Sequence, residues 1–371
     1  MEPKTLLRDG AQFTLPAERT SLVAADLDGD RRDELVYGTA EGRVFAIHSG
    51  PGRHDVRNPH LVTARSSELW LGGHAVVTAG DLDGDGRLDL IAGVSTGRLY
   101  QYAEVEKGRY QSPSQVEAGG APFVLDPGPD GMLDGPVQPR LGYACPTLVD
   151  WTGHDRLDLV VGGAGGEVLV LPNDGAANDP RFGSPVPLRC RALPLLTPPR
   201  VRPGAADWNG DGQIDLIALN LQGFLCVYPR IGRYEVDAPV PMVDRLGRCL
   251  RLDGGFGLSG RCALWAGTWT GSGQADILVG LPRANRHVVP AVTGLDFADP
   301  NAIPTVLLLE NLGHGVLCPR PIYRADGSPL VLGSEGCSPS GVITGDSEDL
   351  DLLVGLDDGS VSLIRRDELR W

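Results

Sequence analysis

The chain has 371 residues, and 51 glycines and 30 prolines make up about a fifth of it without the Gly-X-Y period of collagen. Hydrophobic residues account for 42% of the chain, enough for a core, and this mixture is typical of many short strands joined by turns. The formal net charge of −15 argues against nucleic acid as a partner, because a phosphate-binding surface needs an excess of lysine and arginine.

The first ten residues, MEPKTLLRDG, lack the apolar stretch of a secretory signal peptide. We expect an extracellular or periplasmic location after removal of a leader, and a cytoplasmic location stays open as the alternative. No apolar run in the chain approaches the roughly 20 residues of a membrane-spanning helix, so we expect no membrane span. Residues 4–15 are strand-like and have no other evident place in the repeats described next.

An aspartate motif of the type D-x-D-G-D-G-x-x-D recurs along the rest of the chain. The clearest copy reads DLDGDGRLDL, and weaker copies such as TWTGSGQADI lose several acidic residues. Each copy follows a short apolar run and leads into a β-branched or leucine-rich strand, and a glycine turn then precedes another strand. The copies begin at Asp26, Asp81, Asp150, Asp207, Thr268 and, in shortened form, close to Gly345.

The spacing of the motif predicts the fold. Its copies start 55 to about 78 residues apart, the length of a four-stranded propeller blade. We therefore predict an all-β fold, a single β-propeller over residues 1–371. Six blades are counted, and a seventh would need a hidden unit. Because the last unit ends without an outermost strand, we expect residues 1–15 to complete it and so to close the ring and cover its exposed edge.

The acidic positions of the motif predict cation binding. Four carboxylates that converge in one tight loop repel one another unless a hard cation neutralises them, and Ca²⁺ prefers such oxygen ligands. In the two weakest copies threonine, histidine and serine replace acidic residues, so we expect no cation there. We expect about three structural Ca²⁺ sites, with side chains from Asp26, Asp28, Asp30 and Glu34; from Asp81, Asp83, Asp85 and Asp89; and from Asp207, Asn209, Asp211 and Asp215.

The sequences DLDGDGRLDLIAG and DWNGDGQIDLIAL resemble the FG-GAP and VCBS repeats of integrin α-subunit propellers, fungal propeller lectins and several polysaccharide lyases. The resemblance covers nearly the whole chain. It implies a propeller with each cation in the hairpin after an innermost strand, opposite the usual ligand face. Because this repeat serves adhesion, sugar binding and catalysis alike, the resemblance does not choose among these activities.

The residues that enter each innermost strand should mark the opposite face, around the central axis. Residues 126–142 and 282–302 are insertions that we expect on this same face, where long loops on a rigid scaffold often carry function. The charged and proton-transferring side chains expected at this rim are Arg19, His74, Tyr143, Arg200, Arg202 and Arg261.

This combination of residues favours recognition of an acidic poly- or oligosaccharide. Arginine binds carboxylates bidentately, and a histidine or tyrosine nearby can transfer protons. We therefore predict a polysaccharide lyase that cleaves a uronic-acid glycan by β-elimination. Propeller lyases of the resembling class are similar in using these residue types. In this interpretation His74 and Tyr143 are catalytic, and the substrate carboxylate is bound by Arg19, Arg200, Arg202 and Arg261.

Two other functions stay open. A non-catalytic lectin or adhesion propeller has the same scaffold, although its sugar pocket should repeat from blade to blade, and these rim residues differ at every blade. A glycoside hydrolase would need two carboxylates across a pocket. Those could come from Glu18, Asp130, Asp134 and Glu335.

Overall fold

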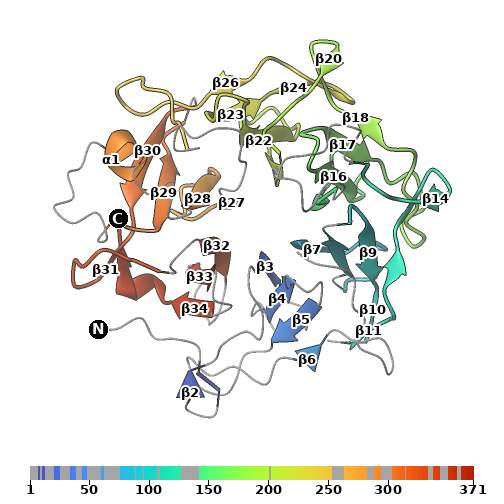
Figure 1. Cartoon of the computed structure of the whole chain (residues 1–371), viewed down its shortest axis with the longest axis horizontal. Coiled ribbons are helices and arrows are strands. Elements are labelled where there is room, and N and C mark those ends of the chain that lie inside the picture. Colours follow the sequence, from blue (N-terminus) through green and yellow to red (C-terminus); the bar gives the residue numbers. More distant parts are fainter. Residues whose placement is uncertain are drawn as a thin grey trace, which may run out of the picture.

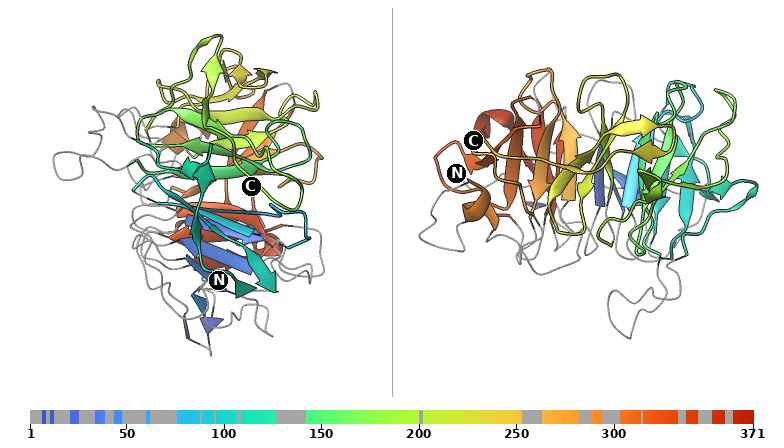
Figure 2. Two further views of the ribbon diagram at one scale, coloured as in Figure 1. Left: turned by 90° about the vertical axis from the view of Figure 1, so that its right-hand side faces the viewer. Right: turned by 90° about the horizontal axis from the view of Figure 1, so that it is seen from above.

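In the computed structural model, the described part of the chain comprises residues 7–8, 11–12, 21–25, 34–38, 44–47, 60–61, 76–87, 89–94, 96–106, 109–126, 142–199, 202–252, 263–281, 288–293, 303–313, 315–332, 337–342, 350–356 and 361–371. These residues are almost entirely strands and turns. Figure 1 shows their sheets arranged around a common axis. Seen from the side in Figure 2, the strands run across the thickness of the ring.

Three consecutive four-stranded antiparallel sheets come from the first half of the chain. The first contains β3 (Ser21–Ala25), β4 (Glu34–Gly38), β5 (Val44–Ile47) and β6 (His60–Leu61). The second contains β7 (Val76–Gly80), β8 (Asp89–Gly93), β9 (Leu99–Tyr102) and β12 (Ser114–Gln115). The third contains β15 (Cys145–Val149), β16 (Asp158–Gly162), β17 (Val168–Leu171) and β18 (Val186–Pro187).

The second half of the chain continues the same pattern. The fourth sheet contains β21 (Gly204–Ala206), β22 (Asp215–Leu219), β23 (Leu225–Tyr228) and β26 (Val240–Pro241). The fifth contains β27 (Ala263–Gly267), β28 (Asp276–Gly280), β29 (Val306–Asn311) and β30 (Leu317–Pro321). The sixth has three strands among the described residues, β32 (Cys337–Val342), β33 (Asp351–Leu356) and β34 (Val361–Ile364).

Shorter elements decorate these sheets. The pairs are β1 (Leu7–Arg8) with β2 (Ala11–Gln12), β10 (Glu104–Glu106) with β11 (Arg109–Tyr110), β13 (Glu117–Ala118) with β14 (Ala121–Pro122), and β31 (Tyr323–Arg324) with β35 (Leu369–Arg370). A mixed sheet contains β19 (Arg189–Cys190), β20 (Leu193–Pro194), β24 (Arg230–Gly232) and β25 (Glu235–Val236). Two short helices, α1 (Val288–Thr293) and a 3₁₀ turn (Arg366–Glu368), complete the described elements.

The innermost strands of successive sheets contact one another around the axis. β3 contacts β7, β7 contacts β15, and the contacts continue through β21 and β27 to β32, which in turn contacts β3. Each innermost strand begins on one face of the ring and ends at the aspartate motif, so the motif loops and the strand starts lie on opposite faces. The described residues near the N-terminus, β1 and β2, pair with each other.

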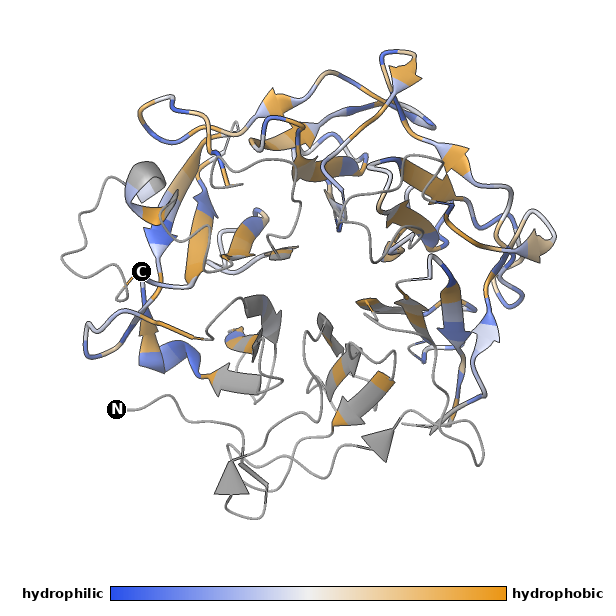
Figure 3. Cartoon of the chain, in the orientation of Figure 1, coloured by the Kyte–Doolittle hydropathy of each residue, from blue (hydrophilic) through white to orange (hydrophobic). Residues whose placement is uncertain are grey.

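The core lies in the seams between neighbouring sheets. In β16, Leu159 and Val161 pack toward the second sheet, whereas Val160 between them packs toward the fourth. All three are fully buried, which is why the strand is apolar at three consecutive positions. Figure 3 shows the same apolar character in the described parts of the central strands. Burial of one such side chain contributes roughly 1.5–3 kcal/mol.

The structure confirms the predicted all-β class and the four-stranded antiparallel sheets. Trp151 and Trp269, the second residues of their motif copies, are 0% and 2% exposed inside seam clusters, so they pack between sheets. Among the described residues, no helix is long and apolar enough to cross a membrane.

Candidate functional site

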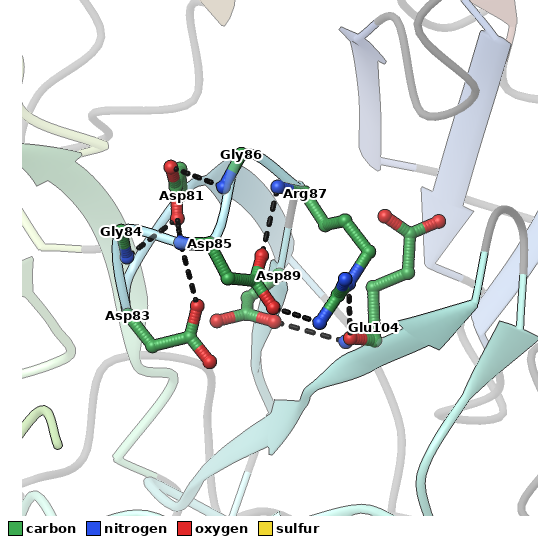
Figure 4. A network of polar contacts seen from close by, with 8 residues as sticks. All are labelled: Asp81, Asp83, Gly84, Asp85, Gly86, Arg87, Asp89 and Glu104. Carbon is green, nitrogen blue, oxygen red and sulfur yellow. Dashed lines mark hydrogen bonds and ion pairs between the residues drawn. The ribbon is translucent and has the colours of Figure 1, made fainter. Parts of the chain in front are cut away.

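The loop after β7 is built around the carboxylate of Asp81 (Figure 4). Its Oδ1 accepts hydrogen bonds from the backbone N–H groups of Gly84 (2.8 Å) and Asp85 (3.1 Å), and its Oδ2 accepts one from Gly86 (3.0 Å). The two glycines have φ of +71° and +82°, left-handed values that a side chain would strain. One carboxylate therefore fixes the turn.

Three carboxylates converge in this loop. An oxygen from each of Asp81, Asp83 and Asp85 lies within 4.8 Å of the other two. Burial, followed by the neighbouring charge of Asp85, raises the pKa of Asp83. Arg87 offsets part of the negative charge, because its guanidinium forms an ion pair with Asp85 and its Nε donates to the carbonyl of Glu104 (3.1 Å). The remaining charge leaves the loop suited to a cation.

Asp89, the first residue of β8, completes the motif and lies 2% exposed beneath the loop. Its Oδ1 accepts the backbone N–H of Glu104 at 2.9 Å. Its Oδ2 is buried and accepts no hydrogen bond among the described groups. Burial raises the pKa of Asp89 to about 7, and the neighbouring aspartates act in the same direction. A buried carboxylate oxygen of this kind normally has a partner.

The loop after β21 repeats this architecture. Asp207 accepts backbone N–H groups from Gly210 (2.8 Å), Asp211 (3.1 Å) and Gly212 (2.9 Å). Below them, Oδ2 of Asp215 accepts the backbone N–H of Trp208 at 3.2 Å, a long bond, and burial raises the pKa of this carboxyl. The Asp207 loop therefore has the same hydrogen-bonded turn as the Asp81 loop.

The two weakest copies of the motif satisfy the same buried oxygen internally. In the third sheet, the backbone N–H and the hydroxyl of Thr152 donate to Oδ2 of Asp158 at 2.7 and 2.9 Å. In the fifth, Thr270 donates in the same way to Asp276 at 2.7 and 2.8 Å. A threonine at the third motif position thus supplies the partner that Asp89 lacks among the described groups.

The first predicted cation loop is not described. Asp26, Asp28 and Asp30 lie outside the described residues, and Glu34 is placed only as the first residue of β4.

On the opposite face, two of the predicted rim residues lie in neighbouring segments of the described chain. Tyr143 precedes β15 and is 8% exposed, and Arg202 precedes the neighbouring β21. The hydroxyl of Thr147 donates to the carbonyl of Pro203 at 2.7 Å and joins the two strand starts. Burial raises the pKa of Cys145 to about 12, and the nearby Arg202 charge opposes that rise. Arg202 therefore lies close to the segment that carries Tyr143.

Tyr143 has an unusual backbone conformation, with φ of +47°. A left-handed conformation is strained for a bulky residue and is often found at functional sites. The other predicted rim residues, Arg19, His74, Arg200 and Arg261, lie outside the described part of the chain.

Comparisons with known proteins agree with this architecture. Residues 26–92, which span two of the motif loops, match the family described as FG-GAP-like repeat. The BP39L lectin of Burkholderia pseudomallei has a similar structure (TM-score 0.59, 15% identity, covering 98% of this chain and 87% of that one). Residues 26–92 of this chain therefore carry an FG-GAP-like repeat, and the arrangement of its sheets is that of a β-propeller. No curated protein matches the chain by sequence.

Two further solved structures share the fold of this propeller. A lectin of Agrocybe aegerita, which recognises non-reducing terminal N-acetylglucosamine, aligns with TM-score 0.51 at 16% identity over 97% of this chain and 82% of its own. The α-L-arabinofuranosidase Arb93A of Fusarium graminearum, solved with an iminosugar inhibitor, aligns with TM-score 0.53 at 11% identity over 94% and 92%. At these identities the likeness concerns the fold.

Two features of this propeller were not predicted from the sequence. The last motif aspartate has a structural role in every described copy, because its Oδ1 accepts a backbone N–H from the end of the third strand. Threonine at the third motif position was the available signal for a loop that satisfies this aspartate without a cation. The second feature, a pair of carboxylates in a seam between sheets, has no sequence signal, since Asp126 and Glu167 belong to different repeats.

Proposed function

We propose that this chain is a calcium-stabilised propeller that binds an acidic carbohydrate on the face opposite its aspartate loops. The observation that carries the proposal is the buried Oδ2 of Asp89, which has no hydrogen-bond partner among the described groups. It lies beneath three converging carboxylates. A hard cation bound among these carboxylates would also give the buried oxygen of Asp89 a partner.

The threonine loops support the calcium assignment. Thr152 and Thr270 supply hydrogen bonds to Asp158 and Asp276, whereas Asp83 at the matching position has no proton to donate once ionised. The Asp81 and Asp207 loops would therefore each hold one Ca²⁺. The Asp26 loop would hold a third, and this assignment rests on its sequence. Loops that are this exposed favour moderate affinity, which suits an extracellular or periplasmic protein.

Thermal unfolding with excess chelator or excess calcium tests the metal. A ligand at 100 times its Kd stabilises the folded state by about 2.7 kcal/mol, so we expect a higher melting temperature with calcium. Calorimetric titration of D83N/D85N should show one site fewer than the wild type, and Ser272→Ala, in a threonine loop, should bind as many ions as the wild type. Identical melting curves with chelator and calcium would exclude the proposal.

The ligand face supports carbohydrate as the partner. Three proteins with this fold are lectins or a glycosidase, and each covers most of this chain. On the face itself, Arg202 lies in a partly buried position beside the segment of Tyr143, and burial lowers the pKa of this arginine. A carboxylate would stabilise the buried guanidinium by a charge-assisted hydrogen bond. We therefore favour a uronic acid as the bound sugar.

The finer proposal is cleavage of that glycan by β-elimination. Arg202 would neutralise the carboxylate at C5 and so acidify the C5 proton. One side chain would take this proton while another protonates the leaving oxygen at C4, and the C4–O bond would break as the C4–C5 double bond forms. Tyr143 and His74 are the two candidates for these steps.

A lectin without turnover is the second candidate, and the burial of Tyr143 favours it. Incubation with uronate polysaccharides, followed near 235 nm, distinguishes the two functions through the unsaturated product. If the chain is a lyase, Tyr143→Phe should lower kcat by roughly 10²–10⁴ and leave the calcium-dependent melting unchanged. Binding of a uronate glycan with no product would establish the lectin, and absence of binding would contradict both.

We also propose that the six sheets are the six blades of the ring and that residues 1–15 complete the last of them. The contact between β32 and β3 supports closure, and β34 has no outer partner strand among the described residues. Deletion of residues 1–15 should then cause aggregation, measured by light scattering, because an unpaired strand edge promotes association. A truncated chain that stays monomeric with wild-type melting would place the closing strand elsewhere.

A further inference from the structure

In two seams, an arginine from one sheet contacts the motif loop of the sheet before it. Arg230 follows β23 of the fourth sheet, and its backbone N–H donates to Oδ1 of Asp215 in the same sheet at 2.9 Å. Its side chain crosses to the third sheet, where Nη1 donates to the carbonyl of Trp151 and the guanidinium carbon lies 5.5 Å from the centroid of the Trp151 ring. Arg366 has the same place in the sixth sheet and packs on Trp269 of the fifth.

The loop that Arg230 reaches has the turn of an acid-rich loop. Asp150 accepts the backbone N–H groups of Gly153 (2.7 Å), His154 (3.0 Å) and Asp155 (2.8 Å), the same three bonds that shape the loop of the second sheet. Gly153 and Asp155 also have left-handed backbones, with φ of +73° and +55°. The difference lies in the third and fifth motif positions, where Thr152 and His154 replace acids.

The guanidinium of Arg230 brings positive charge to this loop. Burial lowers the pKa of Arg230, and the negative charges of Asp150 and Asp158 act in the opposite direction. The guanidinium therefore lies within electrostatic reach of the first and last acids of the loop. Because arginine stays protonated in proteins, this charge is permanent. A metal ion that entered the same loop would be repelled by it.

The residue at the position of Arg230 differs according to the loop before it. The position is defined by a backbone N–H that donates to Oδ1 of the last motif aspartate in its own sheet. After the threonine loops of the third and fifth sheets, the residue is Arg230 or Arg366. After the acid-rich loops of the second and fourth sheets, it is Asn173 or Asn311, which are uncharged. In the four seams for which both partners are described, arginine thus accompanies threonine.

Arginines inside the loops do not explain this difference. Arg87 in the second sheet and Arg156 in the third have the same motif position, and the Nε of each donates at 3.1 Å to a carbonyl at the end of the third strand, that of Glu104 or Asn173. An acid-rich loop and a threonine loop therefore carry the same internal cation. They differ in the charge that comes from the following sheet.

We propose that the arginine of the following sheet takes the place of calcium at the threonine loops of the third and fifth sheets and keeps the ion from binding there. The proposal rests on the calcium-binding function given above and names the residues that restrict it. Threonine satisfies one buried oxygen from within its own loop, whereas Arg230 and Arg366 balance charge from the next sheet. The ring would then hold a cation in each of these seams, either a metal ion or a guanidinium.

Calorimetric calcium titration of loops with restored acids tests this role. T152D/H154D/R230Q should bind one ion more than the wild type. T152D/H154D keeps the arginine, so any added site should bind calcium at least about 10-fold more weakly. The matched control is T152D/H154D/R191Q, because Arg191 lies in the same seam and forms its ion pair with Asp237. This control should bind calcium as T152D/H154D does.

A second measurement needs no calcium. With excess chelator, Arg230→Gln should lower the melting temperature, and less than about half of that loss should remain in an Asp150→Asn background, because the partner charge is gone. Arg191→Gln should cause the same loss in both backgrounds. Equal losses for Arg230→Gln in the two backgrounds would overturn the charge role of this arginine, whether or not the acid-restored variants fold.

The outcomes distinguish this proposal from the calcium function itself. If the wild type binds calcium, but T152D/H154D and T152D/H154D/R230Q gain a site of equal affinity or no site, the role of Arg230 is overturned and the calcium function stands. If the wild type binds no calcium and only T152D/H154D/R230Q acquires a site, the calcium function is overturned and the role of Arg230 is supported.

Discussion

The guanidinium carbon of Arg366 lies 4.1 Å from the ring centroid of Trp371 and 4.5 Å from that of Trp269. Trp269 belongs to the motif loop of the fifth sheet, whereas Arg366 follows the last strand of the sixth. The backbone N–H of Arg366 donates to Oδ1 of Asp351 at 2.8 Å, which holds its position. The cation therefore joins the fifth and sixth sheets through two aromatic rings.

Replacing this cation should weaken the seam. Arg366→Met keeps the length of the side chain and removes the charge, so we expect a loss of about 1–2 kcal/mol in the free energy of unfolding. Trp371→Ala should cost somewhat more, about 2–3 kcal/mol, because apolar contact is also lost. Urea denaturation measures both, and Arg245→Met in an exposed turn is the control. Equal midpoints for the two methionine variants would refute the stabilising role of this contact.

The threonine loops lead to a prediction that is independent of calcium. Thr270→Val leaves Oδ2 of Asp276 without its hydroxyl donor, so we expect a loss of about 1–3 kcal/mol. The loss should be the same with calcium and with chelator. Ser272→Ala in the same loop should be nearly neutral, since Ser272 is exposed and only accepts a bond of 3.3 Å. A loss for Thr270→Val that appears only with calcium would show that this loop also binds the ion.

Close approach of the second and third sheets depends on Gly93. A Cβ at this position would lie 2.2 Å from the carbonyl oxygen of Ala144 and 2.7 Å from Cδ of Pro146. Gly93→Ala should therefore force the backbones apart and cost about 2–3 kcal/mol. The control is Gly247→Ala, which has open space but φ of +75° and should cost about 1 kcal/mol. Chemical denaturation measures both losses in the free energy of unfolding. A larger loss for Gly247→Ala than for Gly93→Ala would contradict the predicted clash.

Cysteine reactivity should follow burial. Burial raises the pKa of Cys145 and of Cys226 to about 12, whereas Cys249 is an exposed free thiol. At pH 8 the two buried thiols should carry roughly a thousandfold less thiolate than an ordinary cysteine and resist iodoacetamide. Peptide mass mapping after short labelling should find Cys249 modified first. Prompt labelling of Cys145 in the folded protein would show that this site opens.

The same pKa shifts predict the direction of one pH effect. The unfolded chain releases these thiol protons near the ordinary pKa of about 8.5, whereas the folded chain keeps them until about pH 12. Stability should therefore fall as the pH rises above about 9, because ionisation favours the unfolded state. Alanine at both positions should flatten that decline.

Much of the architecture was predictable because each strand and turn has a local signal. One repeat contains all the signals for its own strands and turns. The repeat that begins at Asp81 has the glycines of its loop, then an apolar run, then a glycine turn before the next strand. These features depend on residues that are close in sequence, so the sequence pattern contains them.

What could not be predicted depends on contacts between repeats. The hydrogen bond from the hydroxyl of Thr147 to the carbonyl of Pro203 joins the starts of β15 and β21, and it forms only because these two strands belong to neighbouring sheets. The carboxylates Asp126 and Glu167 share one hollow, although each is unremarkable in its own segment. The backbone conformation of Tyr143 also has no counterpart in the sequence pattern.

The last motif aspartate has two separate roles: its Oδ1 accepts a backbone N–H just after the third strand, and its Oδ2 faces the motif loop. Asp89 and Asp158 make the same backbone contact, at 2.9 and 2.6 Å, although only the loop of Asp89 retains a full set of acids above it. A duplicated repeat can therefore exchange an ion for a threonine hydroxyl while the hairpin below it keeps its shape. The choice between an ion and a hydroxyl is thus local to one loop of the ring, because the contact below that loop is the same in both cases.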